Sequence, residues 1–361
     1  MKFAVVRNHN DPALEVLVDD LTRTCIGHGH EPIAEPNGVG FVFNITDASH
    51  PRFVRRRSQS LFVFSLIHVH QSVEDLKAIC YTALIQTLAN QLICLVQKDD
   101  GGQEVIFTTP EAGFYHAPYD PERVYQSIIP IASAHFATEN LFSHDLPGEY
   151  HEPSPVVREI FRYGKELDLM GVLPVPFPLN DVLTEEGRRQ LYKIYGITGA
   201  SYGNLSARES IPSLGRTTFW MTGRGVNKAR LSEVGEDVLL VKGFDHDNGT
   251  ALLSVPPDTD PQARVSVDAV EHSLIYESFP EVGAIVHAHA WMDDIPCTRQ
   301  NFPCGTRELA EEVVELLRKT PDPVHCVVGL KNHGVTITGV SLAEIFGRIR
   351  GHLRTQVQMF A

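Results

Sequence analysis

Hydrophobic and polar positions follow two different periods along the first 150 residues of the chain. Short runs rich in Val, Phe and Ile have the length of strands, and longer amphipathic segments between them are typical of helices. The pattern predicts a mixed α/β domain with helices packed on a sheet. The predicted strands are KFAVVR, GFVFNIT, SLFVFSLIHV, QLICLVQ and EVIFTT, and the predicted helices are Pro12–Gly27, a segment from Ser72 (as N-cap) towards Asn90, and a segment after Asp120-Pro121.

Prolines become dense between Pro147 and Pro178, and the amphipathic stretch Val156–Leu169 between them predicts one helix. We place the domain boundary at about residue 150, with a boundary near residue 178 as the alternative. The expected parts are an N-terminal α/β domain of unknown role (1–150) and a second domain (151–361) that begins with a connecting segment (151–180).

The composition excludes several classes of protein. The 361 residues are 43% hydrophobic and 21% charged, an ordinary balance for a globular protein of two domains. The net charge of −14 argues against nucleic acid or an anionic membrane as a partner. The six cysteines show no CxxC spacing, and no apolar run has the length of a signal-peptide core or a membrane span. We therefore expect a cytoplasmic protein.

The strongest chemical signal is the segment Gly283-Ala-Ile-Val-His287-Ala-His289. On a strand, side chains two residues apart project from the same face, so both imidazoles would point to one place. His333, beside Gly334 at a predicted turn, is a third candidate. Three histidines would leave an open position on a metal ion, as catalytic sites require. A single histidine is more often a packed core or turn residue, so this interpretation depends on the combination.

The chain from Leu183 onwards resembles the class II aldolase/adducin family, and residues 1–150 do not. The resemblance rests on four segments in the family's order. They are a glycine-rich loop (Thr198–Arg208), the turn Met221–Gly225, an acid-and-metal segment (Asp268–His289), and a closing block (Gly305–Ala310, then Asn332-His333-Gly334). For this part of the chain the resemblance implies an α/β/α three-layer domain around a mostly antiparallel sheet, and a homo-oligomer, either a tetramer or a dimer.

The resemblance also implies the roles of individual residues. His287, His289 and His333 would bind a divalent metal ion, Zn²⁺ in most members, with Mn²⁺ and Fe²⁺ as alternatives. The catalytic carboxylate would be Asp268, nineteen residues before His287, with Glu271 as the alternative. Backbone and polar groups of two further segments would bind an anionic, possibly phosphorylated, substrate. These substrate-binding candidates are Gly203, Asn204, Thr222 and Gly223.

The implied activity is that of a metal-dependent lyase. Such an enzyme cleaves a C–C bond of a small, sugar-like hydroxy-carbonyl compound, by retro-aldol cleavage or decarboxylation, through a metal-stabilised enediolate. An epimerase and an iron-dependent oxygenase built on the same site are alternatives. A non-catalytic, adducin-like scaffold is an alternative from another class, although a scaffold has no need of three histidines and an acid.

Some positions depart from the family's pattern or lie outside it. The Ser-Ser pair usual before the acid reads Ser266-Val267 here, which leaves the substrate open. Arg208, Arg224 and Lys228 would either add positive charge to the site or lie on the surface. In the first domain, His28-Gly-His30 and His68-Val-His70 suggest a second metal site, but they lack acidic or cysteine partners at convincing spacing. The segment Pro110–His116 is expected to be a packed loop.

Overall fold

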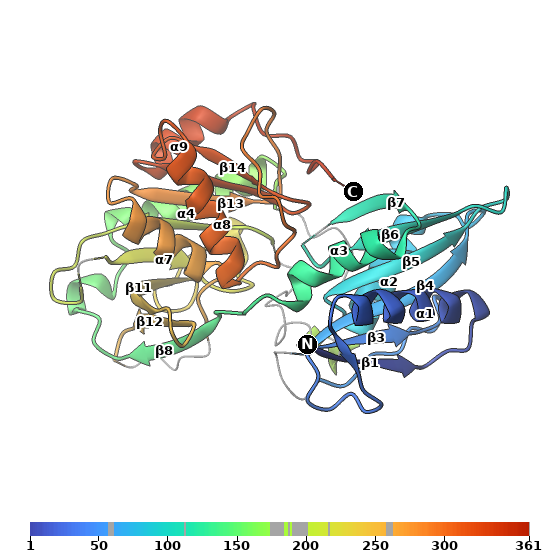
Figure 1. The fold of residues 1–361 in the computed structure, drawn as a ribbon. Helices are drawn as coiled ribbons and strands as arrows, with labels where there is room; N and C mark the ends of the chain where they lie inside the picture. The colour runs from blue at the N-terminus through green and yellow to red at the C-terminus, as the bar shows by residue number, and fades with distance from the viewer. Residues whose placement is uncertain are drawn as a thin grey trace. The chain divides into compact units, whose positions relative to one another are not determined.

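A computed structural model of the chain describes residues 1–56, 61–111, 113–173, 184–186, 188–189, 201–215, 217–257 and 263–360. The first three residues of the predicted glycine-rich loop, Thr198 to Ala200, and the end of the predicted connecting segment lie outside this part of the chain. The chain forms two compact units, built mainly from Met1–Ala134 and from His135–Val175 together with Tyr195–Gln358. Each is described by itself (Figure 1).

The first unit contains a seven-stranded mixed sheet in the order β2-β1-β3-β4-β5-β6-β7. The first five strands in this order are parallel, and β6 and β7 are antiparallel to their neighbours. Residues from Phe62 to Ile67 are all buried, which requires cover on both faces of the sheet. The elements are β1 (Lys2–Arg7), α1 (Pro12–Gly27), β2 (Glu31–Pro32), β3 (Phe41–Ile45), β4 (Phe62–His70), α2 (Leu76–Thr87), β5 (Gln91–Gln97), β6 (Gln103–Thr108), β7 (Phe114–Pro118) and α3 (Pro121–Ala132).

The expected strands and helices of this unit are confirmed, with two corrections. Helix α2 does not begin at Ser72: its N-cap is Asp75, whose carboxylate accepts from the N–H of Ala78, whereas the Ser72 hydroxyl contacts His70. The segment expected to be a packed loop contains strand β7, which pairs with β6. Its alternation of partly exposed and buried residues is typical of an edge strand.

The second unit contains an eight-stranded sheet in the order β14-β15-β13-β9-β10-β11-β12-β8. Every neighbouring pair is antiparallel except β12 and β8, which confirms the expected mostly antiparallel sheet. The elements are β8 (Glu139–Ser143), α4 (Pro155–Leu169), β9 (Asn204–Arg208), β10 (Phe219–Thr222), β11 (Val238–Asp245), β12 (Thr250–Ser254), α7 (Ala269–Ser278), β13 (Ala284–Ala288), α8 (Arg307–Lys319), β14 (Val327–Leu330), β15 (Gly334–Gly339) and α9 (Leu342–Ile349), with short 3₁₀ turns at Gly148–Tyr150 and Lys228–Arg230.

Helices cover both faces of this sheet. Residues of α7 and α8 share one hydrophobic core with Phe219 and Met221 of β10, and Figure 1 shows these two helices side by side. Trp220 lies between these two residues on β10, so its side chain points to the opposite face of the sheet. Its Nε1 donates to Glu209, which also accepts from Ser154 at the start of α4. Because successive strand residues point to opposite faces, α4 lies on the other face together with α9. The unit therefore has the expected three layers.

The two units divide between Ala134 and His135, earlier in the chain than the expected boundary at residue 150. The reason is β8, which pairs in parallel with β12 and so makes residues 139–143 an edge strand of the second sheet. The predicted helix over Val156–Leu169 is confirmed as α4, which packs within the second unit.

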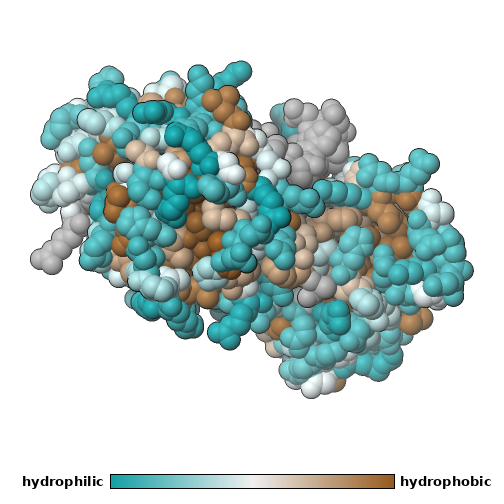
Figure 2. Space-filling model, turned by 90° about the horizontal axis from the view of Figure 1, so that it is seen from above, coloured by the Kyte–Doolittle hydropathy of each residue, from teal (hydrophilic) through white to brown (hydrophobic). Residues whose placement is uncertain are grey.

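In the described part of the chain, no helix is long and apolar enough to cross a bilayer. On the face shown in Figure 2, hydrophilic residues predominate and hydrophobic residues gather in separate patches.

Candidate metal centre

Two of the three candidate histidines come from strand β13, which lies between β9 and β15 and is buried along its whole length. His287 is the fourth residue of β13, and His289 follows directly after its last residue. Their ring centroids are 5.2 Å apart. The apolar residues Ala284 to Val286 anchor the strand in the core, so the two imidazoles project from its end as the sequence predicts.

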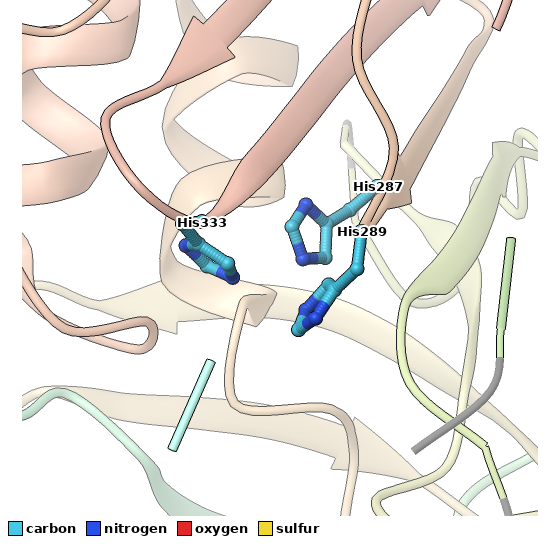
Figure 3. Close-up of side chains that lie close together, drawn as sticks. All are labelled: His287, His289 and His333. Carbon is cyan, nitrogen blue, oxygen red and sulfur yellow. The ribbon is translucent and has the colours of Figure 1, made fainter. Parts of the chain in front are cut away.

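The third histidine comes from the turn between β14 and β15. Asn332 adopts a left-handed backbone conformation (φ 58°), which turns the chain sharply at His333. Gly334, which follows His333, has no room for a side chain, because a Cβ on it would lie 2.3 Å from the carbonyl oxygen of Ala288. This close approach brings the His333 ring within 4.7 Å of the His287 ring and 4.8 Å of the His289 ring (Figure 3).

One potential ligand nitrogen from each histidine lies within 4.8 Å of the others. Burial lowers the pKa of all three imidazoles, most strongly for His289 and His333, and so favours the neutral form that binds metal ions. His287 donates from Nδ1 to the carbonyl of Val335, which leaves Nε2 as its ligand atom. Among the described residues, neither ring nitrogen of His333 has a hydrogen-bond partner. Such nitrogens and this donor set fit a divalent transition-metal ion.

Asp268 lies beside this cluster, at the residue before the first turn of α7. It is 5% exposed, and its carboxylate makes no capping bond to the helix. Its Oδ2 atom instead accepts from Asn204 Nδ2 at 2.6 Å, and the same amide contacts Ser266 Oγ at 3.1 Å. Asn204 is held there because Gly203 lies against β13: a Cβ on Gly203 would be 2.6 Å from the carbonyl oxygen of His287. The structure thus brings Asp268 and Asn204 together.

Glu271, the alternative acid, is held differently. It lies on the first turn of α7 and is 2% exposed, and its Oε1 accepts from Thr336 Oγ1 at 2.6 Å. Thr336 is the cross-strand neighbour of His287. Burial, with a further contribution from the charge of Asp268, raises the pKa of Glu271 to about 8. The raised pKa favours the protonated form of Glu271 at neutral pH.

The remaining substrate-binding candidates are buried and engaged within the protein. The hydroxyl of Thr222 accepts from the N–H of Leu205, and the N–H of Gly223 donates to the carbonyl of Asp237. These bonds join β9, β10 and the loop before β11. A phosphate group could bind to these two residues only in exchange for such contacts.

The basic residues near the glycine-rich loop divide into two kinds. Arg208 donates to the carbonyls of Tyr276 and Val282 and lies over the ring of Tyr276, and Arg224 donates to the carbonyl of Thr138. Lys228, by contrast, is only 3% exposed, and its charge acts on Asp268 and on two of the histidines. The sequence did not decide whether Lys228 belongs to the site or to the surface, because the polar segment around it gives no signal of burial.

His272 is also buried, and the sequence analysis did not assign it a role. Its Nδ1 contacts Ser206 Oγ, and Ser206 in turn contacts the hydroxyl of Tyr276, each at 2.8 Å. Burial, and then the neighbouring His287, lower the pKa of His272 to about 3, so the ring is neutral. Its position four residues after Asp268, on the same face of α7, is the signal that could have identified it.

Comparison with known protein families finds a match in the second unit. Residues 186–292 match the family model described as Class II Aldolase and Adducin N-terminal domain. This part of the chain is similar to class II aldolase/adducin domains, and it includes Asn204, Asp268, His287 and His289. His333 lies beyond the matched residues, and the turn between β14 and β15 brings it next to His287 and His289. The match does not extend to the first unit, and no curated protein matches the chain.

Two solved structures show weaker similarity. An L-fuculose 1-phosphate aldolase is 18% identical, with a TM-score of 0.37, and the alignment covers 56% of this chain and 84% of that one. An aldolase II superfamily protein from Pseudomonas syringae is 16% identical, with a TM-score of 0.31, and the alignment covers 55% of this chain and 72% of that one.

Proposed function

We propose that this protein is a metal-dependent lyase of the class II aldolase type, which cleaves a C–C bond in a small hydroxy-carbonyl compound. The observation that carries this proposal is the convergence of three histidines beside a buried carboxylate, where Nδ1 of His289 and both ring nitrogens of His333 have no hydrogen-bond partner among the described residues. An ion-free structural role does not account for such nitrogens, because leaving buried polar atoms unpaired costs free energy.

His287, His289 and His333 would hold the metal ion, and Zn²⁺ is the proposed ion, with Mn²⁺ and Fe²⁺ as alternatives. When bound, the ion supplies a Lewis acid that polarises a carbonyl group and stabilises negative charge on its oxygen. The bond from His287 Nδ1 to Val335 fixes the tautomer of that ring. His289 is partly exposed, whereas His287 and His333 are buried, so the substrate would approach from the side of His289.

Asp268 is the proposed general acid/base. The bond from Asn204 holds one carboxylate oxygen and leaves the other available to exchange a proton with the substrate. Glu271 suits the role of base less well, because its raised pKa keeps it protonated at neutral pH. We assign Glu271 to positioning, through Thr336, next to the strand of His287. It is the alternative acid if Asp268 proves dispensable.

The proposal also covers the residues that bind the substrate and the assembly of the protein. Gly203, Asn204, Thr222 and Gly223 are the proposed substrate-binding residues, of which Thr222 and Gly223 would have to exchange their contacts within the protein to bind a phosphate group. We further propose a cytoplasmic homo-oligomer, a dimer or tetramer, with a small-molecule substrate. Light scattering of the purified protein tests the assembly: a monomer at micromolar concentration would contradict that part.

The activity is tested by incubating the metal-loaded protein with a panel of hydroxy-carbonyl compounds, with and without a phosphate group, and following carbonyl products and CO₂. Cleavage by the wild type that Asp268→Asn loses would support the lyase. Epimerised product without cleavage would indicate the epimerase, and oxygen uptake with Fe²⁺ would indicate the oxygenase. A protein that binds no metal and converts nothing would leave the adducin-like scaffold.

A further inference from the structure

The feature that the proposed mechanism leaves unused is the buried ammonium group of Lys228. Its side chain begins in the short 3₁₀ turn Lys228–Arg230, which packs against α4: a Cβ on Gly164 would lie 2.6 Å from the carbonyl oxygen of Lys228. This packing fixes the backbone of Lys228 in the interior. A flexible lysine that only happened to lie nearby would extend its charge into water instead.

The charge of Lys228 lacks a close counter-ion. Its Nζ atom donates to the carbonyl of Ser201 at 3.1 Å, and it forms no salt bridge with any residue that the structure describes. Asp268 is the carboxylate whose charge acts on it, but the close contacts of that carboxylate are with Asn204. Burial lowers the pKa of Lys228 to about 8. A buried ammonium ion held by a single carbonyl retains donors for another partner.

The position of this charge points to the substrate. Lys228 Nζ contacts the carbonyl of Ser201, and the next residue, Tyr202, packs its ring 4.4 Å from the ring of His289, so the ammonium group lies on the side of the site that His289 borders. Among the described residues, the negative charge that acts on Lys228 is that of Asp268. A metal ion and Lys228 together would leave the buried site positive, and an anionic group on the substrate would balance it.

We propose that Lys228 binds a carboxylate group of the substrate that is bonded directly to the carbonyl or hydroxyl-bearing carbon, so that the substrate class is a 2-oxo or 2-hydroxy acid. A carboxylate at that position places its oxygens near both the ammonium group and the metal site. A phosphate at the far end of a sugar chain would lie further away, on the side of Thr222 and Gly223, whose groups are engaged inside the protein. This inference rests on the proposed function.

The test compares two probes of nearly equal size, pyruvate and hydroxyacetone, which differ in whether the carbonyl carries a carboxylate or a hydroxymethyl group. Isothermal titration calorimetry with the Zn²⁺-loaded full chain should show that wild type binds pyruvate at least about tenfold more tightly. Lys228→Met should abolish this preference with an unchanged zinc content. Lys242→Met is the matched control, because Lys242 already forms a salt bridge with Asp145 and its removal should leave the preference intact.

The outcomes separate this inference from the proposed function. If wild type binds no zinc, the proposed function fails, and this inference fails with it. If zinc binds normally but wild type does not prefer pyruvate, or Lys228→Met retains the preference, only the role of Lys228 is wrong. Binding of inorganic phosphate in place of pyruvate, lost in Lys228→Met, would also overturn the carboxylate assignment. Lys228→Gln, which keeps a hydrogen-bond donor, replaces the Met variant if that variant does not fold.

Discussion

The chain contains two His-x-His motifs at the ends of strands, and they have different surroundings. His68 and His70 end β4 in the first unit, and His287 and His289 stand at the end of β13 in the second. His68 contacts Asp11 at the N-terminus of α1, and His70 contacts Ser72 and Asp99. In the second unit a turn delivers His333 as a third imidazole. Among the described residues, this trio is the group whose ligand atoms converge.

The comparison shows that the local motif alone does not bring three imidazoles together. Both motifs place two imidazoles at a strand end, as strand geometry dictates. What differs is the long-range contact that adds the third histidine, and this contact depends on the close approach of Gly334 to β13. A second metal site in the first unit, which the sequence made only conceivable, finds no support among the described residues: His68 contacts Asp11 and His70 contacts Asp99, and no third ligand group converges on them.

The largest expected effect concerns the acid beside the second motif. Asp268→Asn should lower turnover by about a hundredfold or more while zinc content is unchanged, because it removes a general acid/base and keeps the contacts of a similar side chain. Glu271→Gln should have a much smaller effect, since Glu271 is already protonated. The measurement is kcat on the substrate found in the activity panel. The reverse ranking of the two variants would exchange their roles.

A second prediction separates the turn of His333 from the rest of the unit. Gly334→Ala should reduce zinc affinity by about tenfold or more, because its Cβ would press on the Ala288 carbonyl and move the neighbouring His333. Gly347→Ala in α9 is the control, since a Cβ there meets nothing within 4 Å. That change should stabilise the unit by about 0.5–1 kcal/mol and leave zinc affinity unaltered. Competition with a fluorescent chelator measures the affinity, and equal affinity in both variants would contradict the packing argument.

A third prediction contrasts the pH dependence of the two units. The folded-state pKa of Glu271 lies above its unfolded value, so between about pH 4.5 and 8 the unfolded state has lost a proton that the folded state keeps. Its contribution to the stability of the metal-free second unit therefore falls as the pH rises through this range. Burial raises the pKa of Asp11, but the bonds from His68 and Leu14 lower it more. The contribution of Asp11 to the first unit is therefore lost as the pH falls through its folded-state pKa.

Thermal unfolding of the metal-free protein between pH 5 and 8 measures the contribution of Glu271, because that of Asp11 changes only below this range. Glu271→Gln should flatten the decline for the second unit and leave the first unit's transition in place. A decline of the same slope in the variant would show that Glu271 is ionised in the folded protein.

Much of the second unit's site followed from short-range sequence patterns. The strand that carries His287, the turn at His333 and the acid nineteen residues upstream all depend on local spacing. Strand β8 and the burial of Lys228 could not be predicted from such patterns, because both depend on contacts between segments far apart in the chain. The start of α2 was misplaced because Ser72 and Asp75 are both good capping residues, and only the folded contacts of Ser72 with His70 decide between them.

The most direct test of the account is the metal content of the purified full chain, measured by inductively coupled plasma mass spectrometry after incubation with Zn²⁺ and removal of the excess. The variants to compare are His287→Ala and His68→Ala, which remove the same residue of the two motifs. The account predicts about one zinc ion per chain in the wild type and in His68→Ala, and almost none in His287→Ala. Full zinc occupancy in His287→Ala, or its loss in His68→Ala, would contradict it.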